Sequence, residues 1–497
     1  MPAWVGAEMP QLAIGSRVRL AHRATTAVVL LALALGVMHA TWFLARTTTY
    51  PHVLDYGEGP LLDQAVRLAS GGSIYRIPGA ASPWTVSNYP PVYPAVEAAL
   101  SAIFGPAYWY GRLLSVLSLV GSAMLVGAIV HHLTRDRFAA VVAALLLPAL
   151  PYDGYWAAFA RVDNLALFLS LAGLWCVLRW PVRNSALVAA IVLLALAGYT
   201  RQTYLLAAPL TAFVWLLGQH RGRALALVGG EAVVVATAGL ILNTITQGGF
   251  WFNIVTANVN EFRWEGALFY LVNVPQQIPV LLLAAGAYAV VAVRERLPSA
   301  RFVGPYLTAG TLLILTAGKI GSSVNYLMEF GVAVCLAVGC LLAWLRSRPR
   351  LLLVALTLLA AQSVYSVLFP PWWYGRTLQA MDNPVSRDQI GRIMRDSGGE
   401  VLTDQEMGEL PLHDRAIVLQ PFEMSQLARA GLWDQSPLLT SIEQQRYSAI
   451  LIYTIPEYPL EKERWSAEML AAIDHAYVPV QRIGTETGGS VVYTPRR

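Results

Sequence analysis

Two closely spaced carboxylates follow the first apolar run of the chain. Asp55 and Glu58 are three residues apart, and Gly57 and Gly59 alternate with them. Acids at a membrane exit are placed to meet a molecule at the bilayer surface, where a carboxylate can take a proton from a reacting group. The same acids would also suit the first turn of a helix that begins near Pro60. The sequence leaves both interpretations open.

Cations recur at the ends of later apolar runs, on the side that the arginine pattern described below assigns to the outside. These polar groups are Arg161 with Asp163, Arg201 with Gln202, and Lys319 with the nearby Asn325 and Tyr326. A single basic side chain at such a place commonly extends to lipid headgroups. Three of them, on a side otherwise poor in positive charge, indicate an anionic, membrane-embedded substrate such as a lipid phosphate.

Two weaker signals accompany these groups. Tyr89 and Tyr93 lie in a proline-rich segment, which suits packing against lipid tails and is also consistent with an ordinary aromatic belt. His52, Asp55 and Glu58 together have the ligand types for a divalent metal, but their spacing is not specific. We therefore assign no cofactor, and a divalent metal is the less favoured alternative.

Two more acids lie inside apolar runs. Glu231 is in the middle of its run, and Glu329 is about one turn inside its own. Acids at membrane depth are functional candidates by default, although a hydrogen bond between helices also explains them. The second explanation is preferred for Glu231.

The composition predicts which structural elements hold these residues in place. Of the 497 residues, 56% are hydrophobic and only 13% are charged, and the mean hydropathy is +0.51. A soluble domain is about a quarter charged. The chain is therefore predicted to be an all-α polytopic membrane protein of about eleven spans, because only a bilayer can absorb this much apolar sequence. The runs are 24–45, 112–130, 138–150, 165–178, 186–198, 204–217, 224–242, 278–293, 302–316, 324–345 and 351–368.

The arginines predict the orientation. Residues 1–23 carry three arginines, and every second loop after them is short and basic. The positive-inside rule makes the N-terminus and these loops cytoplasmic, so the other loops are external. The net charge of +5 is thus a topology signal, and no basic stripe or motif for nucleic acid is present. Residues 91–104 are predicted to form an amphipathic helix at the interface, with a true span as the alternative.

Two regions are predicted to lie outside the bilayer. One is the external loop 46–110 within the membrane domain 24–380. The other is a soluble extracytoplasmic domain over 381–497, where charge rises and short β-rich runs alternate with helical stretches. This alternation indicates a small α/β fold. The predicted strands are 401–403, 416–419, 449–453, 476–480 and 490–494.

The motifs as a set resemble the GT-C superfamily of membrane glycosyltransferases, and within it the protein O-mannosyltransferase-like and aminoarabinose transferase-like enzymes. The residues that carry the resemblance are Asp55-Tyr56-Gly57-Glu58-Gly59, Tyr89-Pro90-Pro91-Val92-Tyr93-Pro94, Arg161-Val162-Asp163 and Arg201-Gln202. The motifs cover the first two-thirds of the chain. One departure is that the two acids are split as Asp-x-x-Glu, whereas many relatives have adjacent acids.

The resemblance implies transfer of a sugar from a polyprenyl-phosphate donor to a lipid, glycan or protein hydroxyl. Asp55 would be the general base, with Glu58 as the second choice, and Asp163 would orient the acceptor or the sugar. Arg201 and Lys319 would bind the lipid phosphate, assisted by Arg161. A single displacement would invert the anomeric carbon.

A transporter or flippase for an anionic lipid or solute is the main alternative function. No internal repeat and no matched pair of broken helices supports it. The high content of Ala, Leu, Val, Gly and Arg is consistent with a GC-rich bacterial genome, so we expect a multi-pass protein of the bacterial plasma membrane.

Overall fold

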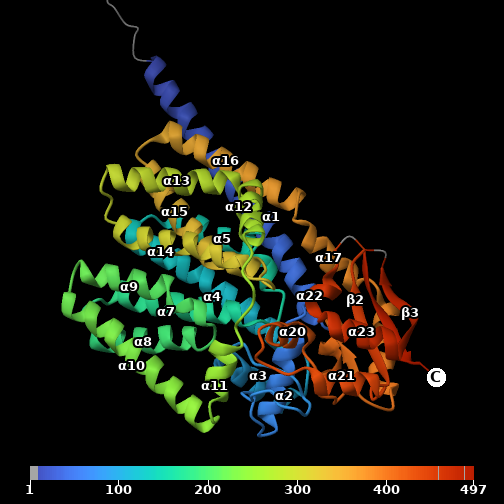
Figure 1. Ribbon diagram of the computed structural model, residues 1–497. Helices are drawn as coiled ribbons and strands as arrows, with labels where there is room; N and C mark the ends of the chain where they lie inside the picture. Colours follow the sequence, from blue (N-terminus) through green and yellow to red (C-terminus); the bar gives the residue numbers. More distant parts are fainter. Residues whose placement is uncertain (1–8, 457, 486, 497) are drawn as a thin grey trace, which may run out of the picture.

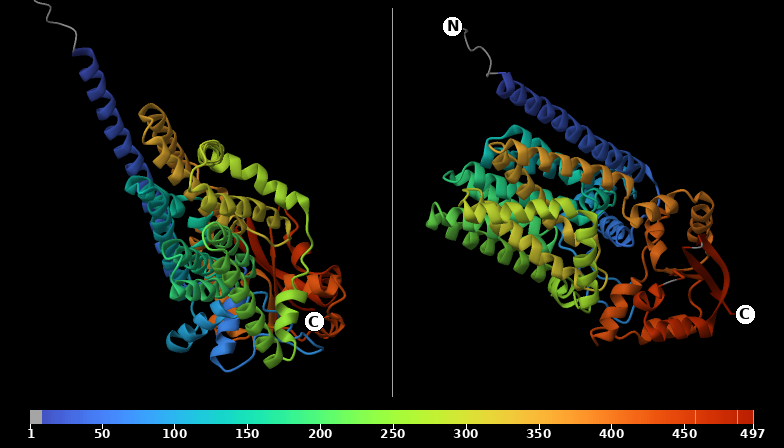
Figure 2. Two further views of the ribbon diagram at one scale, coloured as in Figure 1. Left: turned by 90° about the vertical axis from the view of Figure 1, so that its left-hand side faces the viewer. Right: turned by 90° about the horizontal axis from the view of Figure 1, so that it is seen from above.

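The structure is a computed structural model that describes residues 9–456, 458–485 and 487–496, with side chains described from residue 24 onward. A bundle of long helices carries a smaller domain with a β-sheet at one end (Figures 1 and 2). Residues 1–8 of the predicted cytoplasmic segment lie outside the described residues. Residues 9–23 of it continue the first helix, α1, toward the N-terminus.

Each of the eleven apolar runs coincides with a helix. These helices are α1 (Met9–Thr49), α4 (Trp109–Thr134), α5 (Arg137–Ala149), α7 (Val162–Arg179), α8 (Asn184–Gly198), α9 (Ala207–Leu217), α10 (Arg221–Ile245), α13 (Pro279–Arg294), α14 (Ala300–Leu313), α15 (Met328–Leu345) and α16 (Pro349–Leu368). Among the residues that the structure describes, seven helices are long and apolar enough to cross a membrane. A bent pair, α12 (Trp264–Gln277) and α13, raises the number to eight. The count of eleven spans stays a prediction, because α5, α8 and α9 are shorter.

The helix α15 forms the centre of the bundle. Almost all of its side chains are buried, and it contacts α4, α5, α13 and α14. Small residues make this close packing feasible, as is usual between membrane helices. At Gly339, for example, an added β-carbon would lie 2.9 Å from Ala143.

The basic loops meet at one end of the bundle. Arg346 binds Asp136 at 2.7 Å, and Arg348 binds Glu295 at 3.2 Å, so three of the short basic loops are neighbours. This grouping is what the alternation of arginines predicts. The side of the membrane that this end faces stays a prediction.

The loop after α1 folds over the opposite end. It contains α2 (Glu58–Ala69) and α3 (Val92–Phe104). The helix α3 follows Pro91 and ends at Gly105, whose φ of 75° favours glycine. At 13 residues α3 is shorter than a span needs, which is compatible with the predicted interfacial helix.

Short elements connect the bundle and complete the chain. They are α6 (Asp153–Trp156), η1 (Gln202–Leu205), α11 (Gly249–Trp251), η2 (Phe252–Thr256), η3 (Ile314–Gly318), η4 (Val324–Leu327), α17 (Trp372–Met381), α18 (Pro384–Asp396), η5 (Gln405–Gly408), α19 (Glu409–Leu412), α20 (Pro421–Arg429), α21 (Ser436–Glu443), α22 (Leu460–Arg464) and α23 (Ala467–Ala476).

The C-terminal domain contains one four-stranded sheet in the order β1-β2-β4-β3. Its strands are β1 (Val401–Thr403), β2 (Ala449–Thr454), β3 (Tyr477–Thr485) and β4 (Gly488–Pro495). β1 and β2 are parallel, and the other pairs are antiparallel. Four of the five predicted strands are confirmed. The prediction for 416–419 is wrong, because this segment pairs with Trp84 of the external loop and not with the sheet.

The C-terminal domain is fixed to the external loop by a close backbone approach and by two hydrogen bonds. A β-carbon on Gly59 would lie 2.6 Å from the Cα atom of Gly408. The hydroxyl of Tyr108 donates to the Gly408 carbonyl at 2.6 Å, and the Val53 amide donates to Glu409 at 3.1 Å. The second glycine of the acidic motif therefore allows the two domains to touch.

Candidate active site

A cavity of about 690 Å³ lies where the external loop, the bundle and the C-terminal domain meet. Its volume is in the range of ligand-binding sites. The sequence-predicted residues that line it come from five separate segments. They are Asp55, Tyr89, Arg161, Arg201, Gln202, Lys319, Asn325 and Tyr326.

Asp55 lies in the turn that leads into α2. The turn forms because the Gly57 amide donates to Asp55 Oδ2 at 2.9 Å, which is a common arrangement for aspartate. Asp55 Oδ2 is also 3.3 Å from Arg161 Nη1. About a quarter of the Asp55 side chain is exposed, and it lines the cavity. Burial raises the pKa of Asp55 above its ordinary value; Arg161 lowers it and Glu58 raises it further.

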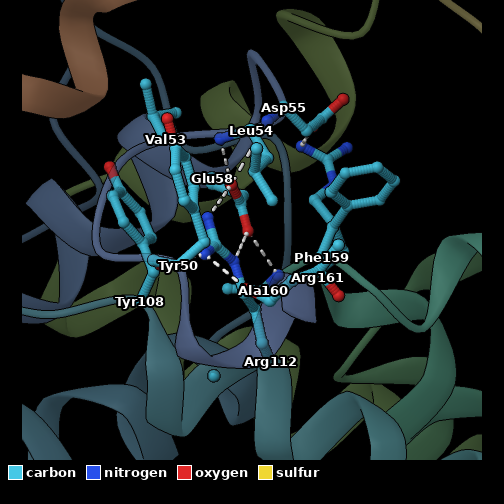
Figure 3. A network of polar contacts seen from close by, with 12 residues as sticks. Tyr50, Val53, Leu54, Asp55, Glu58, Tyr108, Arg112, Phe159, Ala160 and Arg161 are labelled. Atoms are coloured by element: carbon cyan, nitrogen blue, oxygen red, sulfur yellow. Dashed lines mark hydrogen bonds and ion pairs between the residues drawn. The ribbon is translucent and has the colours of Figure 1, made fainter. Parts of the chain in front are cut away.

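Glu58 has a different environment. It is fully buried, and Arg112 donates to its two oxygens at 2.8 and 2.9 Å. The amides of Leu54 and Ala160 each donate to it at 2.8 Å (Figure 3). Burial alone would raise the pKa of Glu58, but Arg112 and these hydrogen bonds hold it below the ordinary value. Glu58 thus joins the turn that carries Asp55 to the turn that carries Arg161, and it does not line the cavity.

Arg161 precedes α7 in an extended conformation. Its Nη2 atom donates to the Tyr89 hydroxyl at 2.8 Å, and its guanidinium lies 5.5 Å from the ring centres of Tyr89 and Trp156. These contacts and Asp55 fix the guanidinium at the cavity wall. Tyr89 and Asp55 therefore both contact the Arg161 guanidinium.

Asp163 is the second residue of α7 and is fully buried. It forms an ion pair with Arg201, accepts from Trp156 Nε1 at 2.6 Å and accepts from Asn325 Nδ2 at 3.1 Å. All of its polar partners are residues that line the cavity, whereas Asp163 itself does not. Its carboxylate is placed to orient Arg201 and Asn325.

Arg201, Lys319 and Gln202 supply the far side of the cavity. The Arg201 guanidinium lies 4.6 Å from the ring centre of Tyr326. Within the described part of the chain, Lys319 Nζ has a single long hydrogen bond, 3.5 Å to the carbonyl of Asn258. Gln202 donates to the Asn88 carbonyl at 3.0 Å. Lys319 is therefore available to meet an anion here, and Arg201, which is paired with Asp163, adds a second positive charge to the cavity wall.

Some predicted residues lie elsewhere. Tyr93 is fully buried in α3 of the external loop, where its hydroxyl donates to Glu97 at 3.4 Å, and it does not line the cavity. Glu231 is buried in α10, and Glu329 lies below the cavity near Arg201. His52 pairs with Glu409 at 3.0 Å. Among the described residues, no group of three or more His, Cys, Asp or Glu side chains is arranged to hold a metal ion.

The C-terminal domain contributes residues that the sequence did not single out. They are Gln420, Phe422, Glu423, Tyr458, Glu463 and Arg464, and all line the cavity. Tyr56, between the two acids in the motif, contacts them: its hydroxyl donates to Glu423 at 3.0 Å. No local pattern marks these residues, since they reach the site only through the packing of the two domains.

Known proteins share parts of the sequence pattern and the fold of this chain. Residues 88–247 match the family model of dolichyl-phosphate-mannose-protein mannosyltransferases. No curated protein sequence matches the chain. The structure of ArnT from Cupriavidus metallidurans bound to undecaprenyl phosphate is similar, with 14% identity, a TM-score of 0.60, and coverage of 92% of this chain and 97% of ArnT.

A second similar structure is the archaeal oligosaccharyltransferase AglB from Archaeoglobus fulgidus, in complex with an inhibitory peptide and a dolichol-phosphate. It is 12% identical, with a TM-score of 0.55, and the match covers 94% of this chain and 74% of AglB. Both matches span the helical bundle and the C-terminal domain. The chain therefore shares the overall fold of these two structures.

Proposed function

We propose that the chain is an inverting glycosyltransferase that moves a sugar from a polyprenyl-phosphate donor to an acceptor hydroxyl on the extracytoplasmic side of a bacterial plasma membrane. The observation that carries the proposal is that Asp55, the only acid of its motif to line the cavity, shares it with Arg201 and Lys319. An acid to take a proton and cations to meet a leaving phosphate are the groups that this reaction needs.

In this reaction Asp55 accepts the proton, and Arg201 and Lys319 bind the leaving phosphate. The acceptor oxygen attacks the anomeric carbon while its proton passes to Asp55. The bond from the anomeric carbon to the phosphate oxygen breaks, and the electron pair leaves with the phosphate. Arg201 and Lys319 stabilise the charge that builds on this phosphate. One displacement inverts the anomeric configuration.

The remaining residues act as positioning residues. Arg161 holds Asp55 at 3.3 Å, and Glu58 fixes both of their loops through Leu54 and Ala160. Asp163 orients Arg201. These contacts support Asp55 as the base and Glu58 as a structural partner of Arg112.

The similar proteins support the choice of donor. The family model is named for a dolichyl-phosphate-mannose substrate, and ArnT and AglB were solved with undecaprenyl phosphate and dolichol-phosphate. The proposal covers a hexosyl or a pentosyl donor, and a lipid, glycan or protein acceptor.

The test is sugar transfer from radiolabelled polyprenyl-phosphate sugars by membranes that contain the wild type, Asp55→Asn or Glu58→Gln. We expect transfer by the wild type and its collapse in Asp55→Asn. If no form consumes the donor while labelled lipid or solute crosses the membrane, the chain is a transporter and the proposal is wrong.

A further inference from the structure

The C-terminal domain forms one complete side of the cavity. We call this side the C-terminal wall and define it as Gln420, Phe422, Glu423, Tyr458, Glu463 and Arg464. It contains two carboxylates and one guanidinium, whereas the bundle contributes Arg161, Arg201 and Lys319. The cavity is therefore cationic on the bundle side and mixed, with an excess of acid, on the C-terminal wall.

Glu423 and Phe422 connect this wall to the acidic motif. Glu423 Oε2 accepts from the Tyr56 hydroxyl at 3.0 Å, and the Phe422 amide donates to the same hydroxyl at 3.3 Å. Tyr56 is adjacent in sequence to Asp55. The carboxylate of Glu423 is therefore hydrogen-bonded to the segment that carries the proposed base, Asp55. Arg201 and Lys319, which would bind the phosphate, come from other elements.

Arg464 completes this group. Its guanidinium lies 4.6 Å from the ring centre of Tyr56. It is held by Gln405 Oε1 at 2.8 Å and by Asp404, which is fully buried, at 3.5 Å. The group is therefore a preorganised site, because its charged members are fixed before any ligand arrives.

The geometry of displacement decides what this wall contacts. In a single displacement the attacking oxygen approaches opposite the leaving phosphate, and the base lies beside the attacking oxygen. The part of the acceptor that surrounds its reactive hydroxyl must then lie near Asp55 and Tyr56, away from Arg201 and Lys319. Glu423 and its neighbours are the side chains that the C-terminal domain places there.

The side chains of the wall suit a sugar ring. Carboxylates accept hydrogen bonds from hydroxyls, an arginine donates to them, and aromatic rings offer apolar faces with polar edges. Tyr458 is about half exposed and has its ring available for such a contact. Resting on the proposed function, we propose that Glu423, Tyr458 and Arg464 form the acceptor subsite and that the acceptor is a saccharide.

The test measures binding separately from transfer. The probes are para-nitrophenyl hexosides and pentosides, compared with peptides that contain serine or threonine, and binding to the protein in lipid nanodiscs is followed by saturation-transfer NMR. We expect a glycoside to bind the wild type and its Kd to rise about tenfold or more in Glu423→Gln, because a hydrogen bond to a charged group is lost. Tyr458→Ala should weaken the same glycoside, and Glu443→Gln, an exposed acid on α21, should not.

Three results would overturn the acceptor subsite. They are absence of glycoside binding, equal binding by Glu423→Gln and the wild type, and preferential binding of the peptides. Consumption of a polyprenyl-phosphate sugar is measured in parallel on the same samples. If glycoside binding depends on Glu423 but no donor is consumed, the residues bind a saccharide and the proposed transferase activity fails.

Discussion

A side chain at Gly57 would occupy the position of the Arg161 guanidinium, which lies 3.3 Å from Asp55. The glycine between the two acids therefore gives Arg161 its access to the proposed base. Arg161 cannot easily give way, because Tyr89 and Trp156 also hold it. The conformation of Gly57 itself is ordinary helical backbone, so space and not backbone freedom requires glycine here.

We therefore expect Gly57→Ala to lower kcat about tenfold or more while the protein stays folded, because a displaced guanidinium no longer fixes Asp55. Transfer kinetics and thermal unfolding in detergent measure the two effects. Gly79→Ala, at a glycine of the same loop with open space around it, is the control. Full activity in Gly57→Ala would contradict the proposed positioning of Asp55 by Arg161.

Replacement of Asp55 should reduce sugar transfer, whereas replacement of Glu58 should reduce stability. Asp55→Asn should reduce transfer about 10²-fold or more, as expected for loss of a general base. Glu58→Gln should instead destabilise the protein by about 3–5 kcal/mol, because it leaves Arg112 charged and buried without its partner. Activity and unfolding in denaturant are measured for both variants. Stability near the wild-type value in Glu58→Gln would contradict its structural role.

This division could not be read from the sequence. The acids look equivalent there, and the partner of Glu58 is Arg112, 54 residues away at the start of an apolar run. The convergence of Asp55, Arg161 and Arg201 could be predicted, because the regular arginine pattern places all three on the same side of the membrane. The sequence grouped Tyr93 with Tyr89 as a substrate-binding residue. Tyr93 is inside α3 and buried, whereas Tyr89 precedes this helix and lines the cavity.

The C-terminal part of the site could not be predicted from local sequence patterns, because its contacts join residues that are far apart in the chain. Local periodicity predicts strands and helices, and four of five strands were found, but the contact of Glu423 with Tyr56 spans 367 residues. The segment 416–419 illustrates the same limit. Its β-rich composition is real, but it pairs with Trp84 of the external loop, which no local signal specifies.

Asp163 gives a prediction about donor binding. Its partners Arg201, Asn325 and Trp156 all line the cavity, so Asp163→Asn should release Arg201 from its orientation. We expect KM for the polyprenyl-phosphate donor to rise about tenfold or more, since charge-assisted hydrogen bonds are lost. The control is Asp474→Asn, at an exposed acid of the C-terminal domain. A lower kcat with unchanged donor KM would assign Asp163 a role in orienting the acceptor instead.

The pH dependence of transfer should report on Asp55. Its pKa is raised, first by burial and further by Glu58, and Arg161 and Arg464 oppose this increase. The base must be ionised to accept a proton, so activity should fall as the pH drops through this raised pKa. The acidic limb of kcat/KM should therefore lie above the pH expected for an exposed aspartate, about 3.9.

Replacing Arg161 tests the sign of this effect. Arg161→Met removes a positive charge that favours ionised Asp55, so the pKa should rise and the acidic limb should move to higher pH. Lys319→Met is the matched control: Lys319 is not among the groups that shift the pKa of Asp55, so donor KM should increase while the limb stays in place. An acidic limb that stays in place or moves to lower pH in Arg161→Met would show that Asp55 is not the titrating base, since loss of the adjacent positive charge must raise the pKa of the carboxylate beside it.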